Sequence, residues 1–424
     1  MLATLTNAWK IPDLRKRIGY TLMMIVVFRL GAAIPVPGIN GELLGTLFND
    51  GGDGILSFFD LMSGGSFKNF TIFALGISPY ITASIIVNLL QIAIPALEQL
   101  AKEGEAGKKK LVQMTRYGTV ILAIVQSIGI TLGLFRRAFI DFNFVSAAIA
   151  VLTLTAGTAF LMYLGEKITE NGIGNGISLF IFAGILSRLP SGTILTVKKV
   201  ISGDINIISL AIFLVLAIAV IAGVIYITQG TRKIPVQYAK RVVGRKMYGG
   251  HSTHIPLKVN QAGVIPVIFS MSLLMFPQTV ASFWPNSDFY GMISKYFSPS
   301  GVAWNVFYAL LIMFFAYFYT SVTFNPIEVA DNMKKNGGFI PGIRPGRPTS
   351  EYLMRTLNRL TLAGGIFLAL VAVLPNAILA IDALEPLQMR FGGTALLIAV
   401  GVSIETMKQI EAQMVMRNYQ GFLK

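Results

Sequence analysis

The chain has 424 residues, of which 54% are hydrophobic and only 13% are charged, and its formal net charge is +15 at pH 7. So little polar surface cannot cover a soluble domain of this size, which excludes a soluble globular protein and indicates a polytopic membrane protein. The sequence contains no cysteine, which excludes disulfides and thiolate metal sites.

Apolar segments recur along the whole chain. The first follows directly after Lys10, Arg15, Lys16 and Arg17, and no small-residue cleavage pattern follows it, so we expect a retained span rather than a signal peptide. About twenty apolar residues are needed to cross roughly 30 Å of hydrocarbon. The sequence therefore predicts ten spans, of which the fifth is short and glycine-rich: Ile18–Ile34, Thr71–Ile94, Tyr117–Phe135, Phe144–Leu164, Ile177–Leu189, Ile207–Ile227, Ala262–Phe283, Trp304–Thr323, Leu360–Leu379 and Thr394–Ala412.

The distribution of charge supports this count. With the N-terminus in the cytoplasm, the cytoplasmic segments together carry +15, the exterior segments carry −1, and Arg29 in the first span supplies the remaining charge. Positive charge accumulates on the cytoplasmic side of membrane proteins, so we expect both termini there. The chain then divides into halves of five spans, residues 1–190 and 191–424. An odd number of spans inverts the second half and favours a site at the interface, although ten unrelated spans are the alternative.

The predicted spans are nearly free of ionisable groups, which coupled transporters usually place at mid-membrane. Arg29 lies in the first span, where a snorkelling or structurally paired arginine explains it better than a substrate contact does. The sequence shows no metal site, phosphate-binding loop or nucleophile beside a base. These features predict a protein that is not an enzyme, has no cofactor and takes its energy from elsewhere.

The segment from Gln229 to Gln261 is strongly basic and contains no acidic residue. Apolar residues alternate with basic ones along this segment and are separated by Gly230, Pro235 and Gly244. This pattern predicts a hairpin-like projection. A loop that only signals topology could be much shorter. Lipid headgroups, RNA and an acidic protein are the three targets that fit its charge. The basic residues are Arg232, Lys233, Lys240, Arg241, Arg245, Lys246 and Lys258.

Two longer motifs are more specific. Residues 74–91 read ALGISPYITASIIVNLLQ, and residues 164–178 read LGEKITENGIGNGIS. Both resemble the signatures of the SecY family, the central channel subunits of the bacterial Sec protein translocase. Shorter matches follow at residues 252–260, 262–266, 324–326, 330–332 and 341–346, so that the resemblance runs from about Pro12 to Met416.

The resemblance implies an all-α channel of ten transmembrane helices, in which two inverted five-helix halves surround a central pore in the bacterial plasma membrane. Such a channel passes unfolded preproteins and releases hydrophobic segments sideways into membrane lipid. The implied partners are SecE, SecG, signal peptides, and either the ATPase SecA or the ribosome at the cytoplasmic loops 228–262 and 323–359. Composition alone also fits a secondary transporter of small solutes, or a membrane scaffold or insertase without a pore.

By the same resemblance, the pore constriction is a ring formed by Ile77, Ile81, Ile181, Ile268 and Ile398. A narrow apolar collar resists wetting and offers no hydrogen bonds to a passing chain. Ile77 and Ile81 are four residues apart and share one helix face, and Pro79 between them can bend the helix without moving either residue off that face. Ordinary packing is the alternative role for each isoleucine.

The resemblance also places a plug at about residues 55–66, with an inert surface helix as the alternative. Its expected packing residues are Leu56, Phe58, Phe59, Leu61 and Met62, followed by a hinge at Gly64 and Gly65. A lateral gate is expected where the second and third spans meet the seventh and eighth. Its candidate residues are Ser84, Asn88, Gln126, Ser127 and Ser272, for which simple hydrogen bonding between helices is the alternative.

Docking of SecA or the ribosome is expected at Arg232, Lys233, Lys240, Arg241, Arg245 and Lys246, together with Arg344 in the loop 337–348. Arginine suits partner recognition because its hydrogen bonds are forked and directional. Local pairing of Arg344 with Glu328 or Asp331 is the alternative. The exterior connection 136–143 is short, so contacts that need a longer loop there are not expected.

Overall fold

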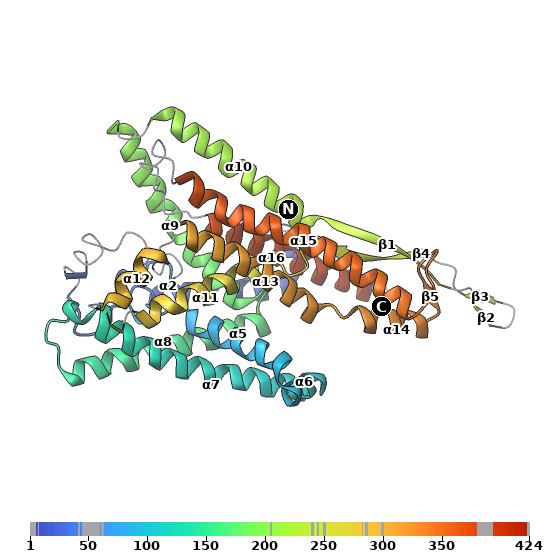
Figure 1. Ribbon diagram of the computed structural model, residues 1–424, viewed down its shortest axis with the longest axis horizontal. Helices are drawn as coiled ribbons and strands as arrows, with labels where there is room; N and C mark the ends of the chain where they lie inside the picture. The colour runs from blue at the N-terminus through green and yellow to red at the C-terminus, as the bar shows by residue number, and fades with distance from the viewer. Residues whose placement is uncertain are drawn as a thin grey trace.

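The computed structural model describes residues 6, 8–40, 43–44, 60, 63–203, 206–238, 241–243, 246–248, 252–281, 283–284, 287–297, 301–379 and 393–421. Long helices lie side by side in a bundle, and a β-hairpin projects from one end (Figure 1). Ten helices of the described chain correspond to the ten predicted spans: α2 (Pro12–Gly31), α5 (Ser78–Ala93), α7 (Glu105–Gly129), α8 (Phe144–Asn171), α9 (Gly176–Ile201), α10 (Ile207–Gln229), α11 (Ile265–Ala281), α13 (Val302–Thr323), α15 (Arg347–Leu379) and α16 (Gly393–Gly421).

Length and composition by themselves identify fewer spans. Among the described residues, six helices are long and apolar enough to cross a membrane, or seven if α5 and the bent continuation α6 (Pro95–Lys102) count as one span. The shorter α11 has 17 residues, and α2 and α16 include charged residues beyond their apolar parts. Short helices complete the bundle: η1 (Ile130–Leu134), η2 (Arg136–Ala138), α12 (Asp288–Tyr296) and α14 (Pro326–Lys335).

Helix ends differ from the predicted span ends, because helical hydrogen bonding continues into residues that lie outside the apolar stretch. The helix α9 runs through Pro190 to Ile201, although we expected a loop between the halves after Leu189. The connection therefore follows Ile201, and the predicted boundary at residue 190 falls inside a helix. Similarly, α15 begins at Arg347 rather than at Leu360.

The second span also begins later than predicted. Its first residues, 71–77, form turns, and α5 begins at Ser78. Pro79 lies in the first helical turn, where its missing N–H would have no helical partner, so it begins the helix rather than bending it. The chain bends instead between α5 and α6, by 101°. Ile81 N still donates to Ile77 O at 3.1 Å, so these isoleucines stay one helical turn apart.

The two loops that we predicted to be cytoplasmic contain β-structure, which confirms the predicted hairpin. Strands β1 (Thr231–Tyr238), β4 (Ser252–Lys258) and β5 (Gly338–Phe339) form an antiparallel sheet in the order β4-β1-β5. Beyond it, β2 (Arg241–Val243) pairs with β3 (Lys246–Tyr248). Alternating residues of β1 bury Ile234 and Val236 against a small core. That core also contains Leu257, Met333, Ile340 and Leu353.

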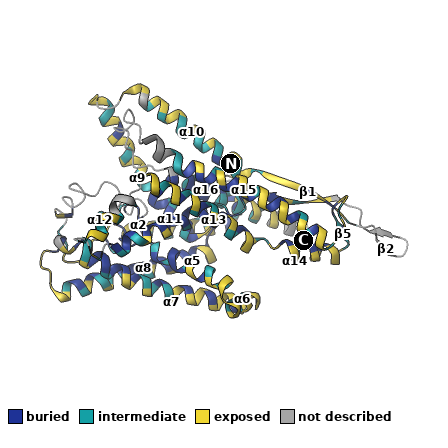
Figure 2. Cartoon of the chain, viewed as in Figure 1, coloured by how far each residue is buried: buried dark blue, intermediate teal, exposed yellow. Residues whose placement is uncertain are grey.

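The main core lies along the middle of the bundle. Figure 2 shows buried residues gathered where α5, α11, α13 and α16 meet, and exposed residues on the outer helices. The helix α10 is strongly apolar, yet almost none of its residues are buried, as expected for a helix that faces lipid.

Candidate functional site

The five isoleucines of the predicted ring lie in one buried apolar cluster. Both halves contribute: Ile77 and Ile81 come from the start of α5, Ile181 from α9, Ile268 from α11 and Ile398 from α16. Each is at most 6% exposed. These apolar side chains offer no hydrogen bonds to water or to a passing peptide. The structure thus brings the five together, and their role as a pore ring stays a prediction.

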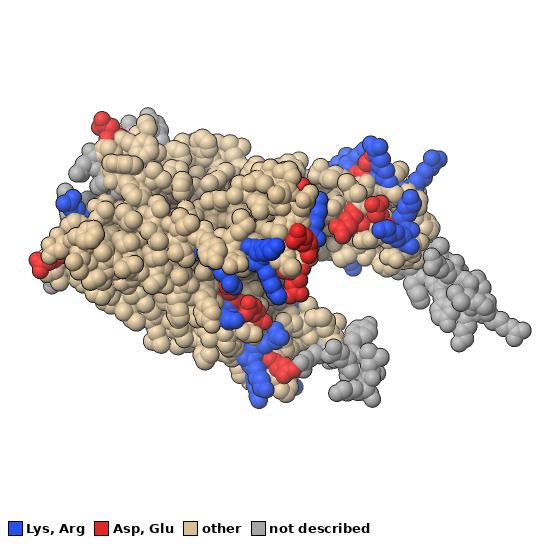
Figure 3. All heavy atoms as spheres, turned by 90° about the horizontal axis from the view of Figure 1, so that it is seen from below, with Lys and Arg blue, Asp and Glu red and all other residues tan. Residues whose placement is uncertain are grey.

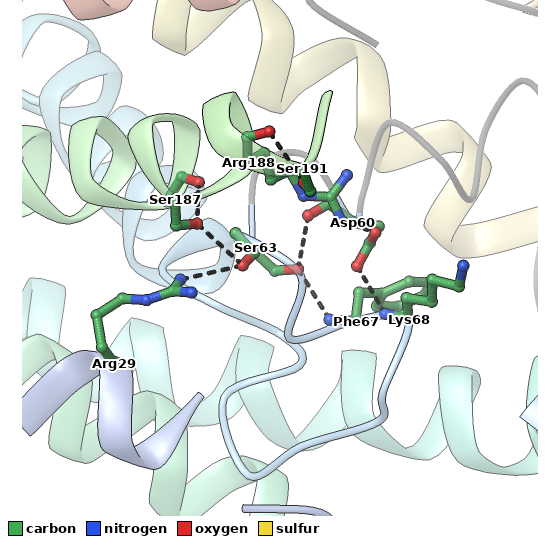
Figure 4. A network of polar contacts seen from close by, with 10 residues as sticks. Arg29, Asp60, Ser63, Phe67, Lys68, Ser187, Arg188 and Ser191 are labelled. Carbon is green, nitrogen blue, oxygen red and sulfur yellow. Dashed lines mark hydrogen bonds and ion pairs between the residues drawn. The ribbon is translucent and has the colours of Figure 1, made fainter. Parts of the chain in front are cut away.

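Residues 63–67, which the predicted topology places on the exterior side and which we call the exterior segment, are fixed by polar contacts (Figure 4). Asp60 is 1% exposed, and its carboxylate pairs with the Arg188 guanidinium from α9. The other carboxylate oxygen accepts a hydrogen bond from Lys68 N at 2.7 Å. Ser63 Oγ donates to Asp60 O at 3.2 Å and accepts from Phe67 N at 2.9 Å. These contacts therefore fix the backbone of the segment as far as Phe67.

The glycine pair adopts a backbone conformation that favours glycine, and its role as a hinge stays a prediction. Gly64 and Gly65 have φ values of +65° and +97°, in the left-handed region where glycine is favoured. A Cβ atom on Gly64 would lie 2.6 Å from Gly184 Cα, so the two backbones touch directly. The expected plug residues Leu56, Phe58, Phe59, Leu61 and Met62 lie outside the described residues.

Arg29 reaches the same segment from α2. Its Nη1 donates to Gly64 O at 3.1 Å, and Ser187 Oγ lies 3.5 Å from the same carbonyl oxygen. This contact agrees with a structurally paired arginine, which is the role that we favoured. The exterior segment is thereby held between α2 and α9.

The candidate gate residues lie on helices that touch. The helix α11 contacts both α5 and α7, and the Phe283 ring fills the space beside Gly129. Gln126, Ser127 and Ser272 are buried, and Ser84 and Asn88 are half-buried. Ser127 Oγ donates to Ile124 O at 2.9 Å and lies 3.4 Å from Thr155 Oγ1 on α8. For Ser127, these contacts support the alternative of structural hydrogen bonding.

The predicted docking residues lie at the end of the molecule that carries the sheet. Arg232 and Lys233 are exposed on β1, and Arg344 is exposed in the neighbouring loop. Thr349 Oγ1 donates to Arg344 O at 2.9 Å, and the described carboxylates include none paired with its guanidinium. Figure 3 shows charged side chains concentrated toward this end. Arg241 and Lys246 lie on β2 and β3, whereas Lys240 and Arg245 lie outside the described residues.

Sequence reasoning missed Asp60 and Arg188. The available signal was an acidic residue inside the predicted plug and an arginine at the end of the fifth span, since charges at such places need partners. It also treated the two cytoplasmic loops separately, although β5 joins them into one sheet. Among the described residues, no group of His, Asp and Glu could hold a metal ion.

Known proteins with similar sequences identify the family of this chain. The family model for SecY matches residues 71–407. A protein translocase subunit SecY from Halalkalibacterium halodurans is 49% identical over 437 residues and covers all of both chains. The chain belongs to the SecY family.

Solved structures support the channel fold. A structure showing that the plug domain of SecY stabilises the closed channel and maintains a membrane seal has a TM-score of 0.66 and 20% identity. The canine Sec61 channel in a ribosome complex has a TM-score of 0.62 and 20% identity. Each match covers 94% of this chain and 92% of the other. These SecY-type relatives give no support to the small-solute transporter alternative.

Proposed function

We propose that this chain is the protein-conducting subunit of a bacterial translocase, which passes unfolded preproteins across the membrane and releases hydrophobic segments laterally into lipid. The observation that carries the proposal is the buried cluster of Ile77, Ile81, Ile181, Ile268 and Ile398, contributed by both halves of a SecY-family bundle. An apolar constriction of this kind seals against ions without binding the polypeptide that passes. Signal peptides enter where α11 meets α5 and α7.

The cytoplasmic face supplies the driving partner. Exposed Arg232, Lys233 and Arg344 lie on two loops joined by one sheet, which suits a large acidic or phosphate-rich surface. We assign this face to SecA and the ribosome, and assign SecE and SecG as membrane partners. The canine Sec61 channel in its ribosome complex supports the ribosome as a partner. Both termini and this sheet lie in the cytoplasm.

A pore variant tests the proposal. The chain, reconstituted in vesicles with its SecE and SecG partners, should protect a preprotein from protease only when SecA and ATP are present. Replacing Ile81 and Ile268 with Asn should raise resting ion conductance roughly tenfold or more, because polar side chains let water enter an apolar constriction. Voltage-clamp recording on planar bilayers measures this.

The matched control is Ile86→Asn, because Ile86 is on the same helix but 43% exposed. It should leave resting conductance unchanged. Equal conductance in the wild-type and the Ile81→Asn/Ile268→Asn channels would contradict the pore assignment, and protease protection without SecA and ATP would contradict the driving mechanism.

A further inference from the structure

One face of α9 carries both a ring residue and the contacts of the exterior segment. Ile181, Gly184 and Arg188 follow one another at spacings of three and four residues, so they share a helix face. Ile181 is 1% exposed within the isoleucine cluster. The backbone of Gly184 contacts the backbone of Gly64, and the Arg188 guanidinium pairs with the Asp60 carboxylate. Movement of α9 therefore affects the ring and the exterior segment together.

The ion pair between Asp60 and Arg188 resists separation. Both carboxylate oxygens of Asp60 have partners, and its side chain is almost completely withdrawn from solvent. Breaking a buried pair by removing one partner leaves the other charge uncompensated, which is strongly unfavourable. By contrast, the pair between Arg347 and Glu351 on α15 is exposed and contributes little.

A second contact holds the segment from the opposite side. Arg29 on α2 donates to the Gly64 carbonyl, while Ser187 on α9 lies within reach of the same oxygen. The segment 63–67 thus bridges α2 and α9, two helices that are themselves in contact. Separation of α9 from α2 cannot preserve both attachments.

We propose that Asp60, Arg188 and Arg29 form a clasp, which holds segment 63–67 against α9 and couples its release to widening of the isoleucine ring. The clasp rests on the proposed channel function and adds the residues that set the threshold for opening. A signal peptide that moves α9 breaks the ion pair and frees the exterior segment in one step. Neutralising either charge lowers that threshold.

The first test compares Asp60→Asn and Arg188→Gln with the charge-swapped variant Asp60→Arg/Arg188→Asp. Each single variant should raise resting ion leak roughly tenfold, since one buried charge is left unpaired. Each should also permit export of a preprotein with a defective signal peptide. The charge-swapped variant should restore part of the discrimination between preproteins with intact and with defective signal peptides. Glu98→Gln, which removes the exposed ion pair with Lys102 on α6, is the control and should change neither readout.

The second test remains informative if a charge variant folds poorly. Ser66 is fully buried and its Oγ has no hydrogen-bond partner among the described residues, so Ser66→Cys breaks no hydrogen bond that the structure describes, and the chain has no other cysteine. Labelling of Cys at this position by a membrane-impermeant maleimide reports release of the segment. We expect labelling to be slow in the otherwise wild-type complex and several-fold faster when Arg29→Gln or Arg188→Gln is added.

The outcomes separate the clasp from the channel function. Unchanged leak and unchanged labelling in the Asp60 and Arg188 variants overturn the clasp. If the Ile81→Asn/Ile268→Asn channel still leaks in the same assay, the proposed channel function stands. If preprotein transport is absent from the wild-type complex, the channel function itself fails.

Discussion

At the scale of single residues, glycines decide how closely the exterior segment approaches the bundle. Gly64 has a positive φ and touches the backbone of Gly184, whereas Gly38 has a φ of +84° and open space around it. A left-handed conformation costs a non-glycine residue roughly 1–2 kcal/mol. A side chain at either position has this backbone cost, but only at residue 64 would it meet other atoms. Comparing the two positions therefore separates the backbone cost from the steric effect.

We predict that Gly64→Ala opens the channel more readily than Gly38→Ala. An alanine methyl at residue 64 would lie 2.6 Å from Gly184 Cα and 3.3 Å from Arg29 Nη1, so the segment must shift. Release of a trapped dye from reconstituted vesicles measures the effect. Gly38→Ala controls for the backbone penalty alone. Equal release by the two variants would show that close contact with Gly184 is unimportant.

At the scale of elements, the cytoplasmic sheet separates its structural residues from its partner-facing residues. Ile234 and Val236 point into the small core, while Arg232 and Lys233 face solvent on the same strand β1. Strand β5 attaches the loop that carries Arg344 to β1. The sheet therefore presents basic side chains from two loops on one folded support.

We predict that the triple variant Arg232→Glu/Lys233→Glu/Arg344→Glu weakens SecA and ribosome binding, with the difference from wild type shrinking at high salt, because salt screens exposed charges. Co-sedimentation with ribosomes and with SecA at low and high salt measures this. Lys198→Glu, an exposed exterior change, is the control and should have no effect.

The structural residue of the same strand should behave differently. Ile234→Ala should destabilise the sheet by about 2–5 kcal/mol through the cavity it leaves. The hairpin should then become more sensitive to protease, and the loss of binding should persist at every salt concentration. Salt-dependent loss in Ile234→Ala, or salt-independent loss in the triple variant, would contradict this division of roles.

At the scale of the whole molecule, charge distribution and helix order together predict the orientation. The charged side chains gather toward the end that carries the sheet (Figure 3), and positive charge favours the cytoplasmic side. The connection from α5 to α7 and the connection from α7 to α8 lie at opposite ends of α7. We therefore expect these two connections on opposite sides of the membrane.

We predict that single cysteines label from opposite sides of the membrane. Asp141→Cys, between α7 and α8, should react with an impermeant maleimide added outside intact cells. Lys335→Cys, at the end of α14, should react only after the membrane is permeabilised. Both native residues are exposed, and the wild-type chain without cysteine supplies the zero background. Labelling of both from the same side would contradict the ten-span orientation.

Much of this architecture was accessible from the residues themselves. Apolar runs predicted the ten helices, since the thickness of hydrocarbon sets a local length requirement that any window of sequence can satisfy. Residues 74–91 and 164–178 indicated the family, and motif matching assigned five isoleucines that occupy one cluster. Helix ends were less accessible, because α9 and α15 continue into polar residues that hydropathy excludes.

The sequence by itself determined that this protein is a ten-helix membrane protein, and it predicted that the basic loops face the cytoplasm. These properties depend on local composition. Only the tertiary structure decided that Asp60 pairs with Arg188, that Arg29 holds Gly64, and that β5 joins the two cytoplasmic loops. A buried charge or an open strand edge requires a partner, but the fold selects which distant residue supplies it.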